Sequence, residues 1–233
     1  MLGPFDYVFW VASFLLEVGV VFCTIYRRVF RSYLPLNTYM ACMALVNCGQ
    51  YACIKRFGYD SPEYAYFYFY TDGLMMILMF LVIMHFYEQI FIEMNVARYI
   101  RGAATLLLAA TALFSYLVIR QHQDHLSGRF IGEFSQNIYF VGLVLTYLLW
   151  GAVLKLRETR TQLVQFVLAL GIYFSGTAAT YALQNLFPGL WLIVLHWLPG
   201  VMGAWLPAAW LYTFAKVPRE ARLSTAPLAV VTR

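Results

Sequence analysis

Charge is the scarcest property of this 233-residue chain. Charged residues make up 12% of it, whereas hydrophobic residues make up 62%. A soluble domain carries about a quarter charged residues. The shortage excludes a water-soluble globule, a disordered chain and a nucleic-acid-binding protein. The remaining class is an integral membrane protein with little mass outside the bilayer, and the lipid bilayer is its first expected partner.

Sequence signatures of common enzymes and metal sites are also missing. We find no H-E-x-x-H, no G-x-S-x-G and no phosphate loop. The four cysteines, Cys23, Cys42, Cys48 and Cys53, form no C-x-x-C pair and have no histidine at metal-ligand spacing. We interpret them as small buried hydrophobic side chains. We expect no cofactor and no metal, and whether the chain is an enzyme stays open.

Seven apolar segments reach the roughly 20 residues that a spanning helix needs. Backbone polar groups in lipid must be bonded internally, so segments this long are helices. The predicted fold class is all-α, a seven-transmembrane-helix bundle, with one domain over residues 1–216 and a short cytoplasmic tail over 217–233. The predicted spans are 5–26, 35–54, 65–89, 102–119, 134–154, 162–186 and 190–215.

Basic residues divide unequally between the two ends of these segments. With the N-terminus outside, twelve fall on the cytoplasmic side and four on the outer side. Cytoplasmic loops of membrane proteins carry the excess of Lys and Arg, so we predict an outer N-terminus and a cytoplasmic C-terminus. The inner set is Arg27, Arg28, Arg31, Arg98, Arg101, Lys155, Arg157, Arg160, Lys216, Arg219, Arg222 and Arg233, and the outer set is Lys55, Arg56, Arg120 and Arg129.

The positions of lysine and histidine argue against retinal and haem. A retinal Schiff base needs a lysine in mid-membrane, but Lys55, Lys155 and Lys216 all stand at segment ends. His85 lies near the inner end of the third segment, and His196 lies near the outer end of the seventh. They are predicted to occupy opposite leaflets, where they cannot ligate one haem.

Two acidic residues lie within the predicted spans, where an ionisable side chain is costly and suggests function. Glu17 is near the midplane of the first segment. It could be a proton carrier or counter-ion, or a protonated side chain bonded to a neighbouring helix. Asp72 lies about 10 Å below the outer boundary, at about 1.5 Å per residue. It could bind a ligand or ion, or simply reach interfacial water.

Polar side chains of several spans pool in the outer half of the bilayer. Asn47 and Gln50 are three residues apart, and Thr180 and Gln184 four apart, so each pair shares a helix face. We predict an outward-facing polar pocket for an unknown small ligand, and the alternative is a set of unrelated interhelical hydrogen bonds. Its expected members, within roughly 15 Å of the outer boundary, are Asn47, Gln50, Asp72, Asn137, Thr180, Gln184 and His196, with Glu17 deeper. Asp72 and His196 would be the charged members.

The run YAYFYFY at 64–70 opens the third segment. Tyrosine favours the membrane interface, so the run is interpreted as part of an aromatic belt. The functional alternative is an aromatic cage for a cation or a flat ligand. Near the sixth and seventh segments, Gly171 and Gly176 permit close helix approach, and Pro199 and Pro207 can kink the chain.

Two stretches, FLLEVGVVFCTIYRRVFRSYLPLNTYM and YFYFYTDGLMMILMFLVIMHFYEQIF, resemble small, functionally uncharacterised seven-helix bacterial inner-membrane proteins. The likeness covers the first three predicted helices and implies a multi-pass protein of the inner (plasma) membrane, with no particular activity. The layout is also similar to the seven-helix sensing modules of bacterial kinases, a fold-level analogy. Those modules precede a kinase or cyclase, whereas we expect only the short tail over 217–233 after the seventh segment.

These observations favour a sensor or receptor-like module with an outward-facing pocket, acting through a membrane or cytoplasmic protein partner. A structural subunit of a larger membrane complex is the first alternative. The second is a small membrane enzyme or carrier that uses Glu17 and Asp72 for proton chemistry.

Overall fold

The computed structural model describes residues 4–59, 61–92, 97–120, 126–156, 160–186, 197–218 and 221–222. Over these residues the chain is all-helical, as predicted, with seven α-helices and one short 3-10 helix, η1. The helices are α1 (Pro4–Tyr26), η1 (Phe30–Tyr33), α2 (Leu34–Phe57), α3 (Pro62–Ile90), α4 (Ala97–Arg120), α5 (Leu126–Lys155), α6 (Thr161–Leu186) and α8 (Leu198–Lys216).

Apolar composition suits these helices to a bilayer. Four of them contain stretches long and apolar enough to cross a membrane: Tyr7–Tyr26, Pro62–Ile90, Asn137–Lys155 and Thr161–Thr180. The shortest of these stretches has 19 residues, close to the length that the hydrocarbon core requires. The chain is therefore a helical protein suited to contact with lipid.

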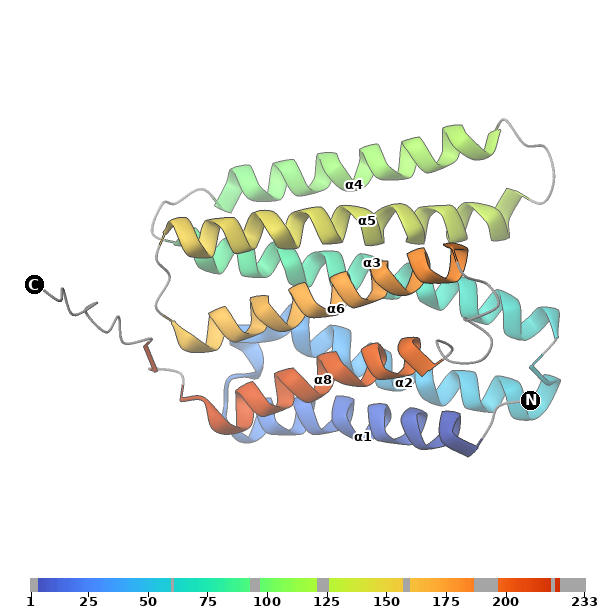
Figure 1. The fold of residues 1–233 in the computed structure, drawn as a ribbon, viewed down its shortest axis with the longest axis horizontal. Coiled ribbons are helices and arrows are strands. Elements are labelled where there is room, and N and C mark those ends of the chain that lie inside the picture. Colours follow the sequence, from blue (N-terminus) through green and yellow to red (C-terminus); the bar gives the residue numbers. More distant parts are fainter. Residues whose placement is uncertain are drawn as a thin grey trace, which may run out of the picture.

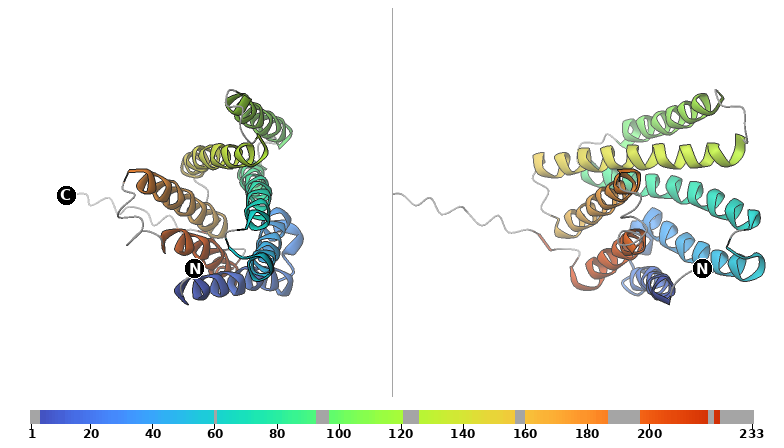
Figure 2. Two further views of the ribbon diagram at one scale, coloured as in Figure 1. Left: turned by 90° about the vertical axis from the view of Figure 1, so that its right-hand side faces the viewer. Right: turned by 45° about the vertical axis from the view of Figure 1, so that its right-hand side comes forward.

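Six of the helices form a closed ring. Along the ring α1 packs on α2, α2 on α3, α3 on α5, α5 on α6, α6 on α8, and α8 returns to α1. Helices that follow one another in the chain run in opposite directions, so α3 lies parallel to α5 in the ring, and α8 lies parallel to α1. An end-on view shows α4 outside the ring, against α5 (Figures 1 and 2). The exposed apolar side chains of α4, such as Leu106 at 73% and Leu113 at 60%, agree with this peripheral place.

An aromatic core fills the half of the ring at the α1–α2 turn. Phe166 stacks on Phe86 with ring centroids 5.7 Å apart and lies 4.8 Å from the ring of Phe214. Tyr33 and Trp210 meet the same cluster edge-on. Aromatic pairs at such distances and tilts are favourable beyond their buried area. Aromatic side chains therefore pack closely in this half of the ring interior.

Glycines permit the closest helix contacts. A Cβ added at Gly176 of α6 would fall 2.3 Å from the sulfur of Met202 on α8. A Cβ at Gly142 of α5 would fall 2.7 Å from the ring of Phe174 on α6. Gly176 therefore permits close contact between α6 and α8, because a side chain there would displace the Met202 side chain.

Two further points concern the last helix and the cysteines. Among the described residues the last helix, α8, begins at Leu198, with Pro199 in its first turn, where the missing N–H of proline costs nothing. Residues 187–196 lie outside the described residues. Cys48 is exposed, not buried, because it faces out of the ring, whereas Cys23, Cys42 and Cys53 are half-buried.

Candidate functional site

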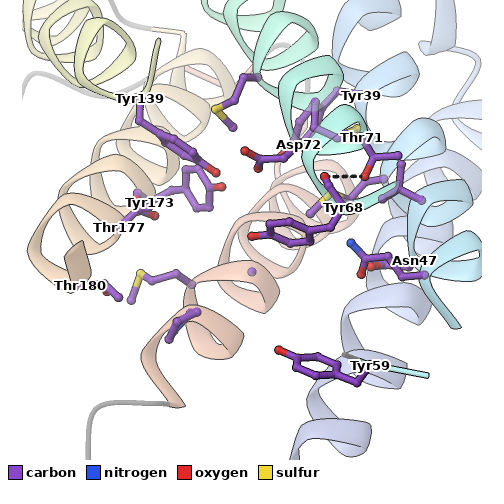
Figure 3. A pocket seen from close by; sticks show the side chains of 18 residues that line it. Tyr39, Asn47, Tyr59, Tyr68, Thr71, Asp72, Tyr139, Tyr173, Thr177 and Thr180 are labelled. Carbon is purple, nitrogen blue, oxygen red and sulfur yellow. Dashed lines mark hydrogen bonds between the residues drawn. The ribbon is translucent and has the colours of Figure 1, made fainter. Parts of the chain in front are cut away.

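A cavity of about 650 Å³ occupies the ring half next to the α2–α3 turn (Figure 3). Small-molecule sites in proteins typically measure about 300–1,000 Å³. Five helices and the α2–α3 turn supply the lining, so the cavity depends on the whole ring. The lining residues are Tyr39, Met43, Val46, Asn47, Gln50, Tyr59, Tyr68, Thr71, Asp72, Met75, Met76, Tyr139, Tyr173, Thr177, Thr180, Pro199, Met202 and Gly203.

Each helix presents its lining residues as one stripe with helical spacing. On α3 the stripe is Tyr68, Thr71, Asp72, Met75 and Met76. The stripe on α2 starts at Tyr39 and continues through Met43, Val46, Asn47 and Gln50, and the stripe on α6 is Tyr173, Thr177 and Thr180. The cavity is therefore a property of aligned helix faces and not of loops.

Four of the predicted pocket residues lie together around this cavity: Asn47, Gln50, Asp72 and Thr180. Asn137 of α5 is half-buried and is not among the lining residues. Gln184 belongs to α6, but its side chain is outside the description, and His196 lies outside the described residues altogether. The predicted pairing of Asp72 with His196 accordingly falls outside them too.

Glu17 stands behind the main cavity wall. Its side chain is 1% exposed, and both carboxylate oxygens accept from Nδ2 of Asn47, at 3.0 and 2.8 Å. The Asn47 side-chain oxygen in turn accepts from Nε1 of Trp10 at 3.3 Å. Glu17 also borders a small cavity of about 10 Å³, which shares Tyr39 and Tyr173 with the main one. Glu17 therefore joins α1 to α2 next to the site, as the interhelical interpretation expected.

Most of the lining was not expected from the sequence. Tyr39, Tyr59, Tyr139 and Tyr173 were not among the predicted pocket residues, although a tyrosine carries a polar hydroxyl. The spacing of these tyrosines from the polar pocket residues along each helix could have identified them. Tyr39 lies on the same α2 face as Asn47 and Gln50, and Tyr173 lies on the same α6 face as Thr180.

The aromatic run at 64–70 divides between the two roles considered for it. Tyr68 lines the cavity, and its ring continues a row with Tyr64 and Tyr59, at centroid distances of 6.4 and 5.3 Å. Tyr66 and Tyr70 are 56% and 57% exposed and face away from the ring interior. One face of the run therefore serves the cavity, and the other suits an interfacial belt.

Charge in the lining has one sign. Asp72 is the only charged residue among the lining residues that the structure describes, and no lysine, arginine or histidine joins it there. Its carboxylate points from α3 into the space shared with Tyr139 and Tyr173 (Figure 3). The arrangement places a carboxyl group among hydroxyls, thioethers and aromatic faces.

The histidine, cysteine, acidic and lysine side chains are scattered over the described part of the chain. No three His, Cys, Asp or Glu residues gather there at metal-binding distance. Lys55, Lys155 and Lys216 each occupy the last turn of a helix. His85 lies at the opposite end from the cavity, where its Nε2 is 3.0 Å from the carbonyl oxygen of Ser32.

Known proteins give no further guide to this site. Comparisons with protein-family models, with curated proteins and with solved structures find no match to the chain. The function must therefore be argued from the cavity itself.

Proposed function

We propose that the protein is a seven-helix module of the inner membrane that binds a small ligand in the ring cavity and acts through a partner protein. The observation that supports this most is the cavity of about 650 Å³, lined by polar groups from α2, α3 and α6. Polar side chains in spanning helices usually face a bundle interior or a water-filled space. In this proposal all seven helices cross the bilayer, with the cavity open to the outside and the C-terminus in the cytoplasm.

The basic residues support this orientation. Arg27, Lys155, Arg160 and Lys216 lie at the ring end away from the cavity, because they stand at the end of α1, the end of α5, the start of α6 and the end of α8. The cavity end carries Lys55 and Arg56 in the last turn of α2 and Arg120 at the end of α4. Excess positive charge marks the cytoplasmic side, so the cavity end faces outwards in the proposal.

A contact path from the cavity to the cytoplasmic end supports a sensing role. Asn47 of the cavity wall holds Glu17 of α1. At the far end of this helix, a guanidinium nitrogen of Arg27 donates to the carbonyl oxygen of Ala215 on α8. A ligand that moves Asn47 would change the contacts of α1, which packs along α8 over its length. The cytoplasmic end of this pair is where a partner would detect the change.

Solvent access tests the proposal. The four native cysteines are replaced by alanine, and Gln50, Thr177 or Thr180 is then changed to cysteine. A membrane-impermeant thiol reagent added from outside should label all three variants, because their side chains line a cavity open to that side. A Leu106→Cys variant is the lipid-facing control and should stay unlabelled, since a charged reagent does not enter hydrocarbon.

A cavity-filling variant makes the test specific. A Cβ at Gly203 meets nothing within 4 Å, although the residue lines the cavity. Gly203→Phe should therefore occupy the cavity and slow labelling at Thr177 at least tenfold, whereas Gly203→Ala should leave it unchanged. Protection of all three cavity cysteines in folded protein, or labelling only from the cytoplasmic side, would contradict the outward-open cavity.

Purification state separates this function from that of a structural subunit. A receptor-like module should remain a folded monomer with a labelled cavity after extraction in mild detergent. A chain that precipitates unless other subunits accompany it, with the cavity positions unlabelled, would instead favour the subunit. The measurement is size-exclusion chromatography with light scattering, on the same cysteine variants.

A further inference from the structure

The ring cavity combines a single negative charge with tyrosine rings from several directions. Asp72 of α3 supplies the charge, and no described lining residue supplies a positive one. Tyr139 and Tyr173 reach into the cavity from α5 and α6, opposite α3, and Tyr68 and Tyr39 come from α3 and α2 (Figure 3). A ligand bound there would therefore contact rings from four helices.

This combination favours a positively charged guest. A carboxylate in a low-dielectric site is stabilised by an opposite charge and repels an anion. Aromatic faces attract cations through the ring quadrupole, and quaternary ammonium groups are typically held by such rings. The sulfur atoms of Met43, Met75 and Met202 complete a soft wall that fits alkyl groups.

The cavity is too large for a bare ion alone and suits an organic molecule. Its volume of about 650 Å³ lies within the range of small-ligand sites. Among the polar lining groups, the amide of Gln50 can bind a hydroxyl or carbonyl on the rest of the ligand. We infer that the ring cavity binds an organic ammonium ion, with Asp72 as its counter-ion and the tyrosines as its cage. This inference rests on the proposed function, because the cavity must be open to solvent.

Matched probe molecules test the charge preference. Choline, its neutral carbon isostere 3,3-dimethylbutan-1-ol and the anion 3,3-dimethylbutanoate share the same branched head, and benzyltrimethylammonium is a larger cation. Each is added to the cysteine-free protein carrying Thr177→Cys, and protection from the thiol reagent is measured against concentration. At least one of the two cations should protect at a concentration at least tenfold below that of the neutral isostere, and the anion should not protect.

Variants identify the residues responsible. Asp72→Asn keeps the shape of the side chain, removes its charge, and should weaken cation protection at least tenfold. Glu63→Gln removes an exposed charge near the start of the same helix and should leave protection unchanged. Tyr139→Phe keeps the ring and should stay within threefold of the parent, whereas Tyr139→Leu should lose about tenfold. Calorimetric titration of each purified variant provides a second readout.

The possible failures are distinguishable. If Thr177→Cys is labelled but no cation protects it, or the neutral isostere protects equally well, the cation inference is wrong and the open cavity stands. If cation protection survives Asp72→Asn unchanged, the assigned counter-ion is wrong. If the thiol at position 177 is never labelled in folded protein, the proposed function itself fails, and the inference fails with it.

Discussion

The side-chain nitrogen of Asn47 donates to both carboxylate oxygens of Glu17, at 3.0 and 2.8 Å. One residue of α2 thus fixes a buried acidic residue of α1 while it lines the cavity on its other side. A buried polar group left without its partner is costly, typically about 1–3 kcal/mol. The contact is therefore both a clamp between helices and a part of the cavity wall.

Removal of this clamp should destabilise the ring. We expect Asn47→Leu to lower the free energy of unfolding by about 2 kcal/mol, because the Glu17 carboxylate loses its donor. Glu17→Gln should cost less, since an amide oxygen can still accept. A double-mutant cycle with both positions changed to alanine should give a coupling energy of about 1 kcal/mol, measured by denaturant unfolding in detergent.

The matched control for the clamp is Leu45→Ala, at a position of α2 that is 71% exposed. It should leave the unfolding curve in detergent nearly unchanged. Additive effects of the two alanine variants would show that Asn47 and Glu17 do not stabilise each other.

Two glycines of α5 should respond oppositely to alanine. Gly142→Ala places a methyl group against the Phe174 ring, and overpacking of this kind costs about 1–3 kcal/mol. At Gly151 the added Cβ meets nothing within 4 Å, so alanine should stabilise the helix by about 0.5–1 kcal/mol. Thermal unfolding of both variants gives the comparison. An equal shift in both would mean that α5 and α6 do not pack as described.

The C-terminal end of α8 should depend on a buried hydrogen-bond chain. The hydroxyl of Tyr33 donates to the Gln162 side-chain oxygen at 3.2 Å, and the amide nitrogen of Gln162 donates to the carbonyl oxygen of Val217 at 3.1 Å. Tyr33→Phe should cost about 1 kcal/mol, because it removes one bond from a buried pair. Tyr26→Phe, at a site that is 81% exposed, is the control and should have no effect.

Reporter fusions test the proposed orientation. A fluorescent protein that matures only in the cytoplasm should be bright when fused after Arg233. Alkaline phosphatase, which is active only outside the cytoplasm, should be inactive at the same position and active when inserted in the α2–α3 turn at Tyr59. The reverse pattern would place the cavity on the cytoplasmic side and require a different account of the basic residues.

Hydropathy predicted the helices well where a long apolar run has no proline. The expected span at 5–26 corresponds to the helix Pro4–Tyr26, and the expected span at 65–89 lies within the helix Pro62–Ile90. The predicted start of the last span at residue 190 lies outside the described residues, and within them α8 begins at Leu198, with Pro199 suited to its first turn. The order of the helices around the ring could not be predicted from the sequence. Hydropathy does not indicate that α8 packs on α1 or that α4 lies outside the ring.

The pocket hypothesis grouped side chains by depth, and depth alone leaves the direction of a side chain open. Asn47, Gln50, Asp72 and Thr180 share both depth and direction, so they line one cavity. Asn137 shares their depth, but the lining residue of α5 is Tyr139. Two residues correspond to about 200° around a helix, so these two side chains leave α5 on nearly opposite sides. Helix rotation depends on packing partners that are distant in sequence.

Closure of the ring by α8 has a consequence for biosynthesis. The cavity walls from α2 and α3 are synthesised well before α8, whose Pro199, Met202 and Gly203 complete them. Until α8 is synthesised, the cavity that Asn47 and Asp72 line lacks the wall that α8 supplies between α6 and α1. We expect insertion intermediates that end before residue 198 to be held by membrane chaperones and degraded if released. Cellular quality control would then recognise the ring as complete only when α1 and α8 are in contact.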